Sequence, residues 1–233
     1  MLSVTGLHAH YGRAHILADL SLEVAAGEVL VLLGRNGAGK STTLKAIMGL
    51  VPPSAGRVEF LGRDITGREP FEIARLGLGY VPEERRIFTE LTVLENLEVG
   101  RRPAPAGGRA WTPERLFELF AGLAPLRDRP AGRMSGGEQQ MLTIARTLMG
   151  NPRLVLLDEP SEGLAPVVVS RMATAIGVLK AEGLSILLSE QNLRFAEQVA
   201  DSAAIIERGR IRWQGGMAAL MRDAALRTKY LSV

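Results

Sequence analysis

The chain has 233 residues, a formal net charge of +3 and no cysteine. This length suits one large domain or two closely packed lobes, and the absence of cysteine excludes disulfides and thiolate metal sites. The small net charge gives no indication of a nucleic-acid partner. No apolar run reaches the roughly 18 residues of a membrane span, and residues 1–12 lack the features of a secretory signal, so we expect a cytosolic protein.

The first 25 residues contain two runs in which apolar and polar side chains alternate, at 2–12 and 16–24. Alternation of this kind predicts strands with one buried face, so we expect an antiparallel β layer here. The layer contains His8, His10 and His15, which we interpret as ordinary surface or packing residues.

Two later runs are continuously apolar rather than alternating, at 29–34 (VLVLLG) and 154–158 (LVLLD). Continuous apolar runs suit parallel strands that are covered on both faces. Further strands are predicted at 184–189 and 203–208, and a helical stretch at 166–182 precedes them. This alternation of strands and helices predicts the α/β class.

Helical signals dominate the segment between these strand regions. Thr92 and Glu95 match a helix capping box, and Pro113 suits the first turn of a further helix. A loop rich in proline and glycine is predicted at 101–110, and a helix over 135–150 is ended by the Asn-Pro pair that follows. We therefore predict a core formed by 1–84 and 151–233, with an inserted helical subdomain at 85–150.

The sequence GRNGAGKS at 34–41 follows the first buried strand and precedes a helical run. It matches the pattern G-x-x-x-x-G-K-[ST], whose backbone N–H groups cradle phosphates at the positive end of a helix. We expect Lys40 to reach the terminal phosphates of a nucleotide and Ser41 to hold Mg²⁺. The alternative is a loop that only needs flexible glycines, and it leaves the lysine and serine unexplained. The predicted nucleotide-binding residues of this loop are Gly34, Asn36, Gly37, Ala38, Gly39, Lys40, Ser41 and Thr42.

Two carboxylates end the second buried strand, in the sequence LVLLDEPSEGL. Asp158 is placed to bind Mg²⁺ directly or through water, and Glu159 is placed to polarise a water that attacks the γ-phosphate. The alternative is a pair of surface carboxylates that cap the next segment. No N-K-x-D motif for guanine recognition occurs in the chain, which argues against a GTPase.

A second glycine pair, Gly136-Gly137, stands where the helix over 135–150 should begin. Ser135 and Glu138 fit a capping box, which is the simpler interpretation of this segment. Capping alone does not require glycine, which costs roughly 1 kcal/mol against alanine at a helical position. Two glycines suit a backbone that lies against an anion, and the chain's own nucleotide is already held by 34–41. We therefore expect a second chain, with a nucleotide sandwiched between the two.

The P-loop, S-G-G-E and D-E-P-S occur in this order, and essentially the whole chain resembles the ATP-binding subunits of ABC transporters. The resemblance implies a P-loop NTPase with a RecA-like core, an antiparallel β layer and a helical subdomain that carries the signature SGGEQ. It also implies that Tyr11 stacks on adenine, although a lone tyrosine equally suits core packing. Residues 161–164 then correspond to the D-loop that crosses the dimer.

Four segments carry a narrower resemblance: VPEERRIF, MSGGEQQML, DEPSEGLAP and SEQN are similar to the smaller ATPase subunit of branched-chain amino acid importers. The closing LRTKYLSV fits the usual short ending of that subunit. Two positions differ from the general cassette pattern, with Glu83 in place of the switch glutamine and Gln191 in place of the switch histidine. A neutral Gln191 still donates a hydrogen bond to a γ-phosphate but carries no charge.

These patterns give three groups of site residues. The predicted catalytic residues are Lys40, Glu159 and Gln191, and the predicted metal ligands are Ser41, Glu83 and Asp158. Beyond the P-loop, the predicted nucleotide contacts are Tyr11, Glu83, Ser135, Gly136, Gly137 and Glu138.

The resemblance implies an ATP-hydrolysing motor on the cytoplasmic face of the inner membrane that powers import of branched-chain amino acids, with ATP and Mg²⁺ as cofactors. The implied partners are a second, non-identical ATPase subunit and membrane permeases that dock near Glu83. A periplasmic binding protein is an indirect partner. The alternatives are import of urea or short amides, a soluble ABC ATPase that acts on ribosomes or DNA, and a nucleotide kinase. Tandem cassettes or coiled-coil insertions are absent from the sequence, and SGGEQ has no role in a kinase.

Overall fold

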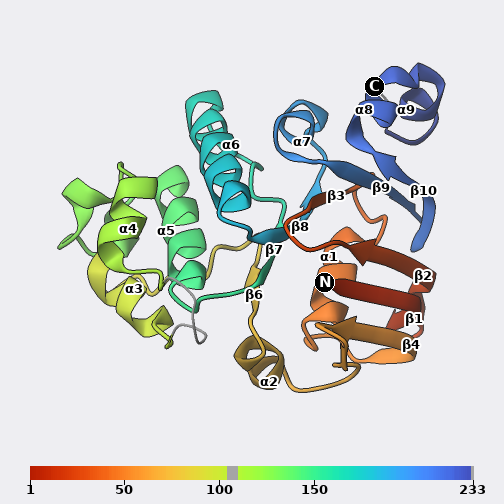
Figure 1. Ribbon diagram of the computed structural model, residues 1–233, viewed down its shortest axis with the longest axis horizontal. Helices are drawn as coiled ribbons and strands as arrows, with labels where there is room; N and C mark the ends of the chain where they lie inside the picture. Colours follow the sequence, from red (N-terminus) through yellow and green to blue (C-terminus); the bar gives the residue numbers. More distant parts are fainter. Residues whose placement is uncertain (104–109, 232–233) are drawn as a thin grey trace.

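Two β-sheets and the helices around them make up the computed structural model, which describes residues 1–103 and 110–231 (Figure 1). The first sheet is antiparallel, with strand order β2-β1-β4-β5. Its strands are β1 (Leu2–Tyr11), β2 (Ala14–Val24), β4 (Pro53–Phe60) and β5 (Arg63–Asp64). The predicted antiparallel layer at the N-terminus is therefore confirmed, and the structure adds β4 and β5 to it.

The second sheet has six strands in the order β10-β9-β3-β8-β7-β6, parallel except for β10 at one edge. Its strands are β3 (Val29–Leu33), β6 (Leu78–Val81), β7 (Leu154–Asp158), β8 (Ser185–Glu190), β9 (Ser202–Glu207) and β10 (Arg210–Gly216). The four strands predicted from apolar runs all lie in this sheet, which confirms the α/β class.

The continuous apolar pattern of the central strands follows from burial on both faces. Val29, Val31 and Leu33 of β3 join one core cluster, and Leu30 and Leu32 of the same strand join the other. The first cluster lies between the sheet and most of the helices, and the second lies between the sheet, α1 (Lys40–Ile47) and the antiparallel layer.

The remaining helices are distributed around these sheets (Figure 1). They are α2 (Pro70–Arg75), α3 (Val93–Gly100), α4 (Pro113–Leu119), α5 (Gly136–Leu148), α6 (Pro166–Ala181), α7 (Leu193–Val199), α8 (Met217–Arg222) and α9 (Ala224–Leu231). Short 3₁₀ turns occur at Ala124–Leu126 and Ala131–Arg133. No helix in the described part of the chain combines the length and the apolar character needed to cross a membrane.

Helices α3, α4 and α5 gather on the side of the molecule away from the antiparallel sheet (Figure 1). They occupy the segment predicted as an inserted helical subdomain, and their buried side chains join the same core cluster as one face of the six-stranded sheet. The subdomain boundaries at 85 and 150 stay a prediction. Most of the predicted loop at 101–110 and the last two residues of the closing segment 226–233 lie outside the described residues.

Candidate active site

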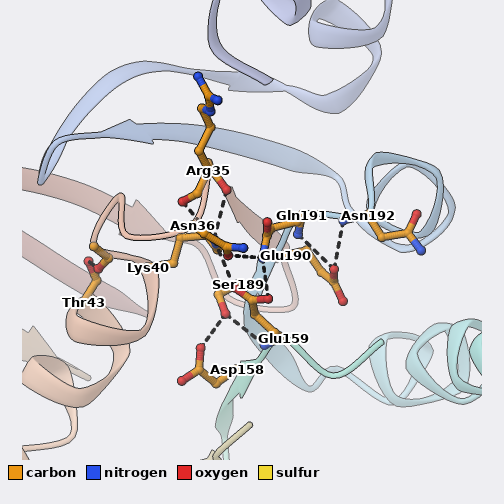
Figure 2. Close-up of polar contacts among 12 residues, drawn as sticks. Arg35, Asn36, Lys40, Thr43, Asp158, Glu159, Ser189, Glu190, Gln191 and Asn192 are labelled. Atoms are coloured by element: carbon orange, nitrogen blue, oxygen red, sulfur yellow. Dashed lines mark hydrogen bonds and ion pairs between the residues drawn. The ribbon is translucent and has the colours of Figure 1, made fainter. Parts of the chain in front are cut away.

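Three neighbouring strands of the parallel sheet end at the same edge, and each is followed by polar residues. β3 lies beside β8, with Leu33 opposite Glu190, and β7 lies on the other side of β8, with Asp158 opposite Ser189. The loop after β3 is the glycine-rich segment 34–41. Figure 2 shows that these three strand ends bring their polar side chains into one cluster. The carboxyl edge of a parallel sheet is where ligands of such folds bind.

The glycine-rich loop has the backbone that an anion site requires. Gly39 is the N-cap of α1 with φ of 112°, a left-handed conformation that side chains disfavour. A Cβ on Gly34 would lie only 2.5 Å from the carbonyl oxygen of Ile206 on β9. No side chain caps the N-terminus of α1, so the N–H groups of its first turn remain available to phosphate oxygens.

Lys40 begins α1, and its ammonium group is buried at the base of this loop. Only 4% of the residue is exposed, and Nζ donates to the carbonyl oxygens of Gly34 at 2.9 Å and Arg35 at 3.3 Å. Nζ also lies 3.0 Å from Oε1 of Glu159, which is 8% exposed. Two of the three predicted catalytic residues, Lys40 and Glu159, therefore form a buried ion pair.

Gln191 closes this arrangement from the end of β8 (Figure 2). Its Nε2 donates to Oε2 of Glu159 at 2.8 Å and to Oδ1 of Asn36 in the P-loop at 2.5 Å. The structure thus brings Asn36 and Lys40 of the P-loop together with Glu159 and Gln191, which lie far from that loop and from each other in the sequence. The bridge from Gln191 to both Asn36 and Glu159 was not predicted from the sequence.

Glu159 remains ionised in this setting. Burial alone would raise its pKa, but hydrogen bonds from Glu162, Gln191 and Lys40, together with the charge of Lys40, hold the pKa below its ordinary value. The same hydrogen bond raises the pKa of Glu162 to about 7, with further contributions from burial and from the charge of Glu159. Glu159 also has φ of 44°, a conformation that is uncommon for residues with a side chain and that recurs at functional sites.

Asp158 lies below Glu159 with 1% exposure and two hydroxyl partners. Ser189 Oγ donates to its Oδ1 at 2.7 Å, and Tyr80 OH donates to its Oδ2 at 3.2 Å. Burial and the Asp158 carboxylate raise the pKa of Tyr80 far above its ordinary range, so the phenol stays a donor. Sequence reasoning missed Ser189 and Tyr80, although the serine that ends an otherwise apolar strand was a usable signal.

Glu83 lies two residues after the end of β6, and its pKa responds to the same carboxylates. Partial burial raises its pKa, and the charges of Glu159 and Asp158 raise it further. The charges of Glu159 and Asp158 therefore reach Glu83, and its role as a nucleotide or metal contact stays a prediction. Hydrogen-bond partners for its side chain do not occur among the described residues.

The glycine pair of the signature segment has an explanation within this chain. Ser135 and Glu138 form a complete capping box at the start of α5, as the simpler interpretation predicted. A Cβ on Gly137 would lie 2.9 Å from Cγ1 of Val168 on α6, and one on Gly136 would lie 2.6 Å from the Arg85 guanidinium. Packing against Val168 therefore accounts for Gly137 without a facing anion, whereas the group near Gly136 is the movable end of the Arg85 side chain. A facing anion at this glycine pair stays a prediction.

The signature segment is not part of the cluster around Lys40. Among the described residues, no hydrogen bond or ion pair joins 135–138 to the P-loop. A contact between this segment and the nucleotide of another chain stays a prediction.

Tyr11 ends β1 and pairs with Ala14 across the hairpin. It is 49% exposed, so the alternative that it fills the core is wrong, and stacking on adenine stays a prediction. Its neighbours His8, His10 and His15 stack on one another at the surface, with 4.2 Å between the ring centres of His10 and His15. This agrees with their interpretation as surface residues.

A twisted parallel sheet with a glycine loop between β3 and α1, and acidic residues at the end of β7, defines a P-loop nucleotide-binding protein. Residues 17–162 match the family model described as ABC transporter, and the chain belongs to this family. As a member of it, the chain is an ATPase.

Known relatives resemble the chain along its whole length. BraG of Pseudomonas aeruginosa, a high-affinity branched-chain amino acid transport ATP-binding protein, is 41% identical over 231 residues, which cover 99% of each chain. LptB of Escherichia coli K12, a lipopolysaccharide export system ATP-binding protein, is 35% identical over 99% of this chain and 96% of its own. A nucleotide-free ATP-binding cassette from an ABC transporter superposes with a TM-score of 0.83 at 30% identity, covering 97% and 96% of the two chains.

Proposed function

We propose that this ATPase powers the import of branched-chain amino acids across the inner membrane. The proposal is supported by the similarity to BraG over nearly the full length of both chains. The similarity to an export ATPase is lower but also spans nearly the whole chain, so the direction and cargo of transport are what an experiment must test. The observation that supports the catalytic roles is the buried contact of Lys40 and Glu159, bridged by Gln191.

Each of these residues has a role that follows from its contacts. When ATP binds, the Lys40 ammonium leaves Glu159 and pairs with the terminal phosphates. It already lies at the N-terminus of α1, whose backbone N–H groups have no side-chain cap and also bind phosphate. Glu159, released and ionised, accepts a proton from the attacking water. Gln191 donates from Nε2 to Asn36 and Glu159, which are themselves site residues. The same N–H group would donate to the γ-phosphate once ATP is bound.

We predict that Asp158, Ser41 and Glu83 would hold Mg²⁺, although no group of three or more His, Cys, Asp or Glu side chains gathers around a metal position among the described residues. The Asp158 carboxylate and the Ser41 hydroxyl supply hard oxygen donors at the same sheet edge, and Glu83 adds a carboxylate close enough to be influenced by Asp158. Ser189 and Tyr80 would orient Asp158 for this role. When bound, the ion neutralises charge on the phosphates of the substrate.

We infer two kinds of protein partner. A second, non-identical ATPase subunit would supply its own 135–138 segment to complete the site. Membrane permeases would dock near Glu83, where residues 83–87, Thr89 and Gln139 line a hollow of about 380 Å³ and the aromatic side chain of Phe88 is exposed beside it. Docking there would place the protein peripherally on the cytoplasmic face of the inner membrane.

The experiment is to co-express the chain with candidate permeases, a second ATPase subunit and a periplasmic receptor, and to measure ATP-dependent uptake of labelled leucine. We expect uptake with the wild-type chain and none with Lys40→Ala. Uptake of urea in place of leucine would support the amide alternative, and uptake of neither would refute import of these substrates. ATP hydrolysis in the same membranes checks that the complex is assembled.

A further inference from the structure

Glu190, the last residue of β8, is a buried carboxylate that none of the roles above uses. It is 2% exposed, and no ion pair involves it among the described residues. Its Oε1 accepts the backbone N–H of Ser161 at 3.0 Å. Its Oε2 accepts the backbone N–H groups of Gln191 at 3.0 Å and Asn192 at 3.1 Å.

A carboxylate in this position needs a structural reason, because removing such a charge from water costs several kcal/mol. Burial accordingly raises the pKa of Glu190, while the hydrogen bonds from Ser161, Asn192 and Gln191 oppose that rise. A neutral apolar residue would fill the same space without this cost. The feature that an apolar residue does not provide is the connection between two loops, one after β7 and one after β8.

The two connected loops carry the residues that must be aligned for hydrolysis. Ser161 lies two positions after Glu159, on the segment 161–164 that resembles the D-loop. Gln191 is bonded to Glu190 through its backbone, while its side chain holds Glu159 at 2.8 Å. One carboxylate therefore holds the backbone of Gln191 and, through Ser161, the segment that begins two residues after Glu159.

We propose that Glu190 is a positioning residue that couples the 161–164 segment to Gln191, so that a shift of either loop is transmitted to the other. This proposal rests on the proposed role of Glu159 and Gln191 in ATP hydrolysis. Because the 161–164 segment is the one expected to meet a partner chain, Glu190 makes the alignment of Gln191 depend on whether that partner is in place.

The test compares Glu190→Gln with Glu197→Gln, a matched change at an exposed position on α7. The amide keeps the size of the side chain but replaces one accepting oxygen with a donor, which faces backbone N–H groups. We expect Glu190→Gln to bind ATP within about twofold of wild type and to lose roughly 10- to 100-fold in kcat, as expected for misaligned catalytic groups. Glu197→Gln should resemble wild type in both.

A double-mutant cycle separates positioning from a general structural role. Gln191→Ala should lower kcat in the wild-type background but have little further effect when Glu190→Gln is already present, because the two act through one contact. Additive effects, or a wild-type kcat for Glu190→Gln, would overturn the proposal. If the Glu190 proposal fails in this way but Glu159→Gln abolishes hydrolysis, the catalytic role of Glu159 would stand and only the positioning role of Glu190 would be refuted.

A measurement on the wild-type protein covers the case in which Glu190→Gln fails to fold. Amide hydrogen exchange should show the N–H groups of Ser161, Gln191 and Asn192 protected in the nucleotide-free chain, although the last two lie in an exposed loop. Rapid exchange at Ser161 and Gln191 would show that the connection does not persist in solution and would refute the coupling.

Discussion

Replacing Glu159 with glutamine should tighten ATP binding, in addition to slowing hydrolysis. The Lys40 ammonium is paired with the Glu159 carboxylate at 3.0 Å, and ATP must compete with this carboxylate for the lysine. Two unit charges at this separation attract by about 5.5 kcal/mol at an effective dielectric constant of ~20, which is an upper limit because pairing also costs desolvation.

The net change is smaller than this limit, since glutamine keeps a neutral hydrogen bond to Lys40. The difference between a charge-assisted and a neutral hydrogen bond is about 1–2 kcal/mol, and the carboxylate also repels the incoming phosphates. We therefore expect ATP to bind roughly 10- to 50-fold more tightly to Glu159→Gln. The free energy of unfolding of the nucleotide-free chain should fall at the same time, because Lys40 loses its counter-charge.

Calorimetric titration with ATP, without Mg²⁺ and at protein concentrations where the chain is monomeric, measures this affinity without hydrolysis or dimer closure. Glu162→Gln is the matched control, because it removes a neighbouring carboxyl group that does not contact Lys40. An affinity for Glu159→Gln that equals or falls below that of Glu162→Gln would show that the ion pair does not compete with ATP.

Three further predictions concern the surroundings of this ion pair. The hydrogen bond to Glu159 raises the pKa of Glu162 from an ordinary 4.5 to about 7. Between these pH values the folded chain therefore binds more protons than the unfolded chain. The free energy of unfolding should decrease as the pH rises toward and through 7. Thermal denaturation from pH 5.5 to 8 measures this slope, and Glu162→Gln should flatten it; an unchanged slope would contradict the carboxyl pair. Gln191→Ala should lower kcat far more than ATP affinity. Gln191→His should stay active with a pH dependence below neutrality, since imidazole titrates near 6.5. An unaltered ATPase rate for Gln191→Ala, in a complex whose partner subunit is catalytically disabled, would show that Gln191 has no role in hydrolysis. Gly137→Ala should destabilise the fold by about 1–3 kcal/mol through overpacking against Val168, whereas Gly137→Asp should also block ATP-dependent dimerisation. Light scattering measures dimerisation of both variants. An equal loss of dimerisation in the two would show that packing alone explains Gly137.

The sequence predicted the centre of the fold well because its signals there are strong and local. Strands β3, β7, β8 and β9 are buried on both faces or nearly so, and this burial appears directly as apolar runs. The elements that sequence reasoning missed lack such signals. β4 contains proline and glycine and exposes residues 54–57, and α7 has only seven residues, too few for a helical period to show.

The candidate site divides in the same way. Motifs assigned Lys40 and Glu159 to one site and the family resemblance added Gln191, and the structure brings all three together where β3, β7 and β8 end. Sequence reasoning could not predict the distances between these side chains or their hydrogen-bond partners, as the bond from Gln191 to Asn36 shows. Glu190 was missed because a carboxylate buried at a strand end has the same sequence appearance as an exposed one.

The arrangement of the site also bears on the prediction that two chains act together. Lys40, Asp158, Glu159 and Gln191 all come from one sheet edge, where Lys40 and Glu159 form a buried ion pair. The capped glycine segment 135–138 belongs to α5 and has no polar contact with this edge among the described residues. A chain that carries both features but does not join them is suited to face a second chain, each supplying the segment that the other lacks. In such a pair the 161–164 segment would lie between the two sites, and through Glu190 its position would be transmitted to Gln191. Hydrolysis would then proceed only when both chains are aligned, which is the behaviour required of a motor that must not consume ATP without its transporter.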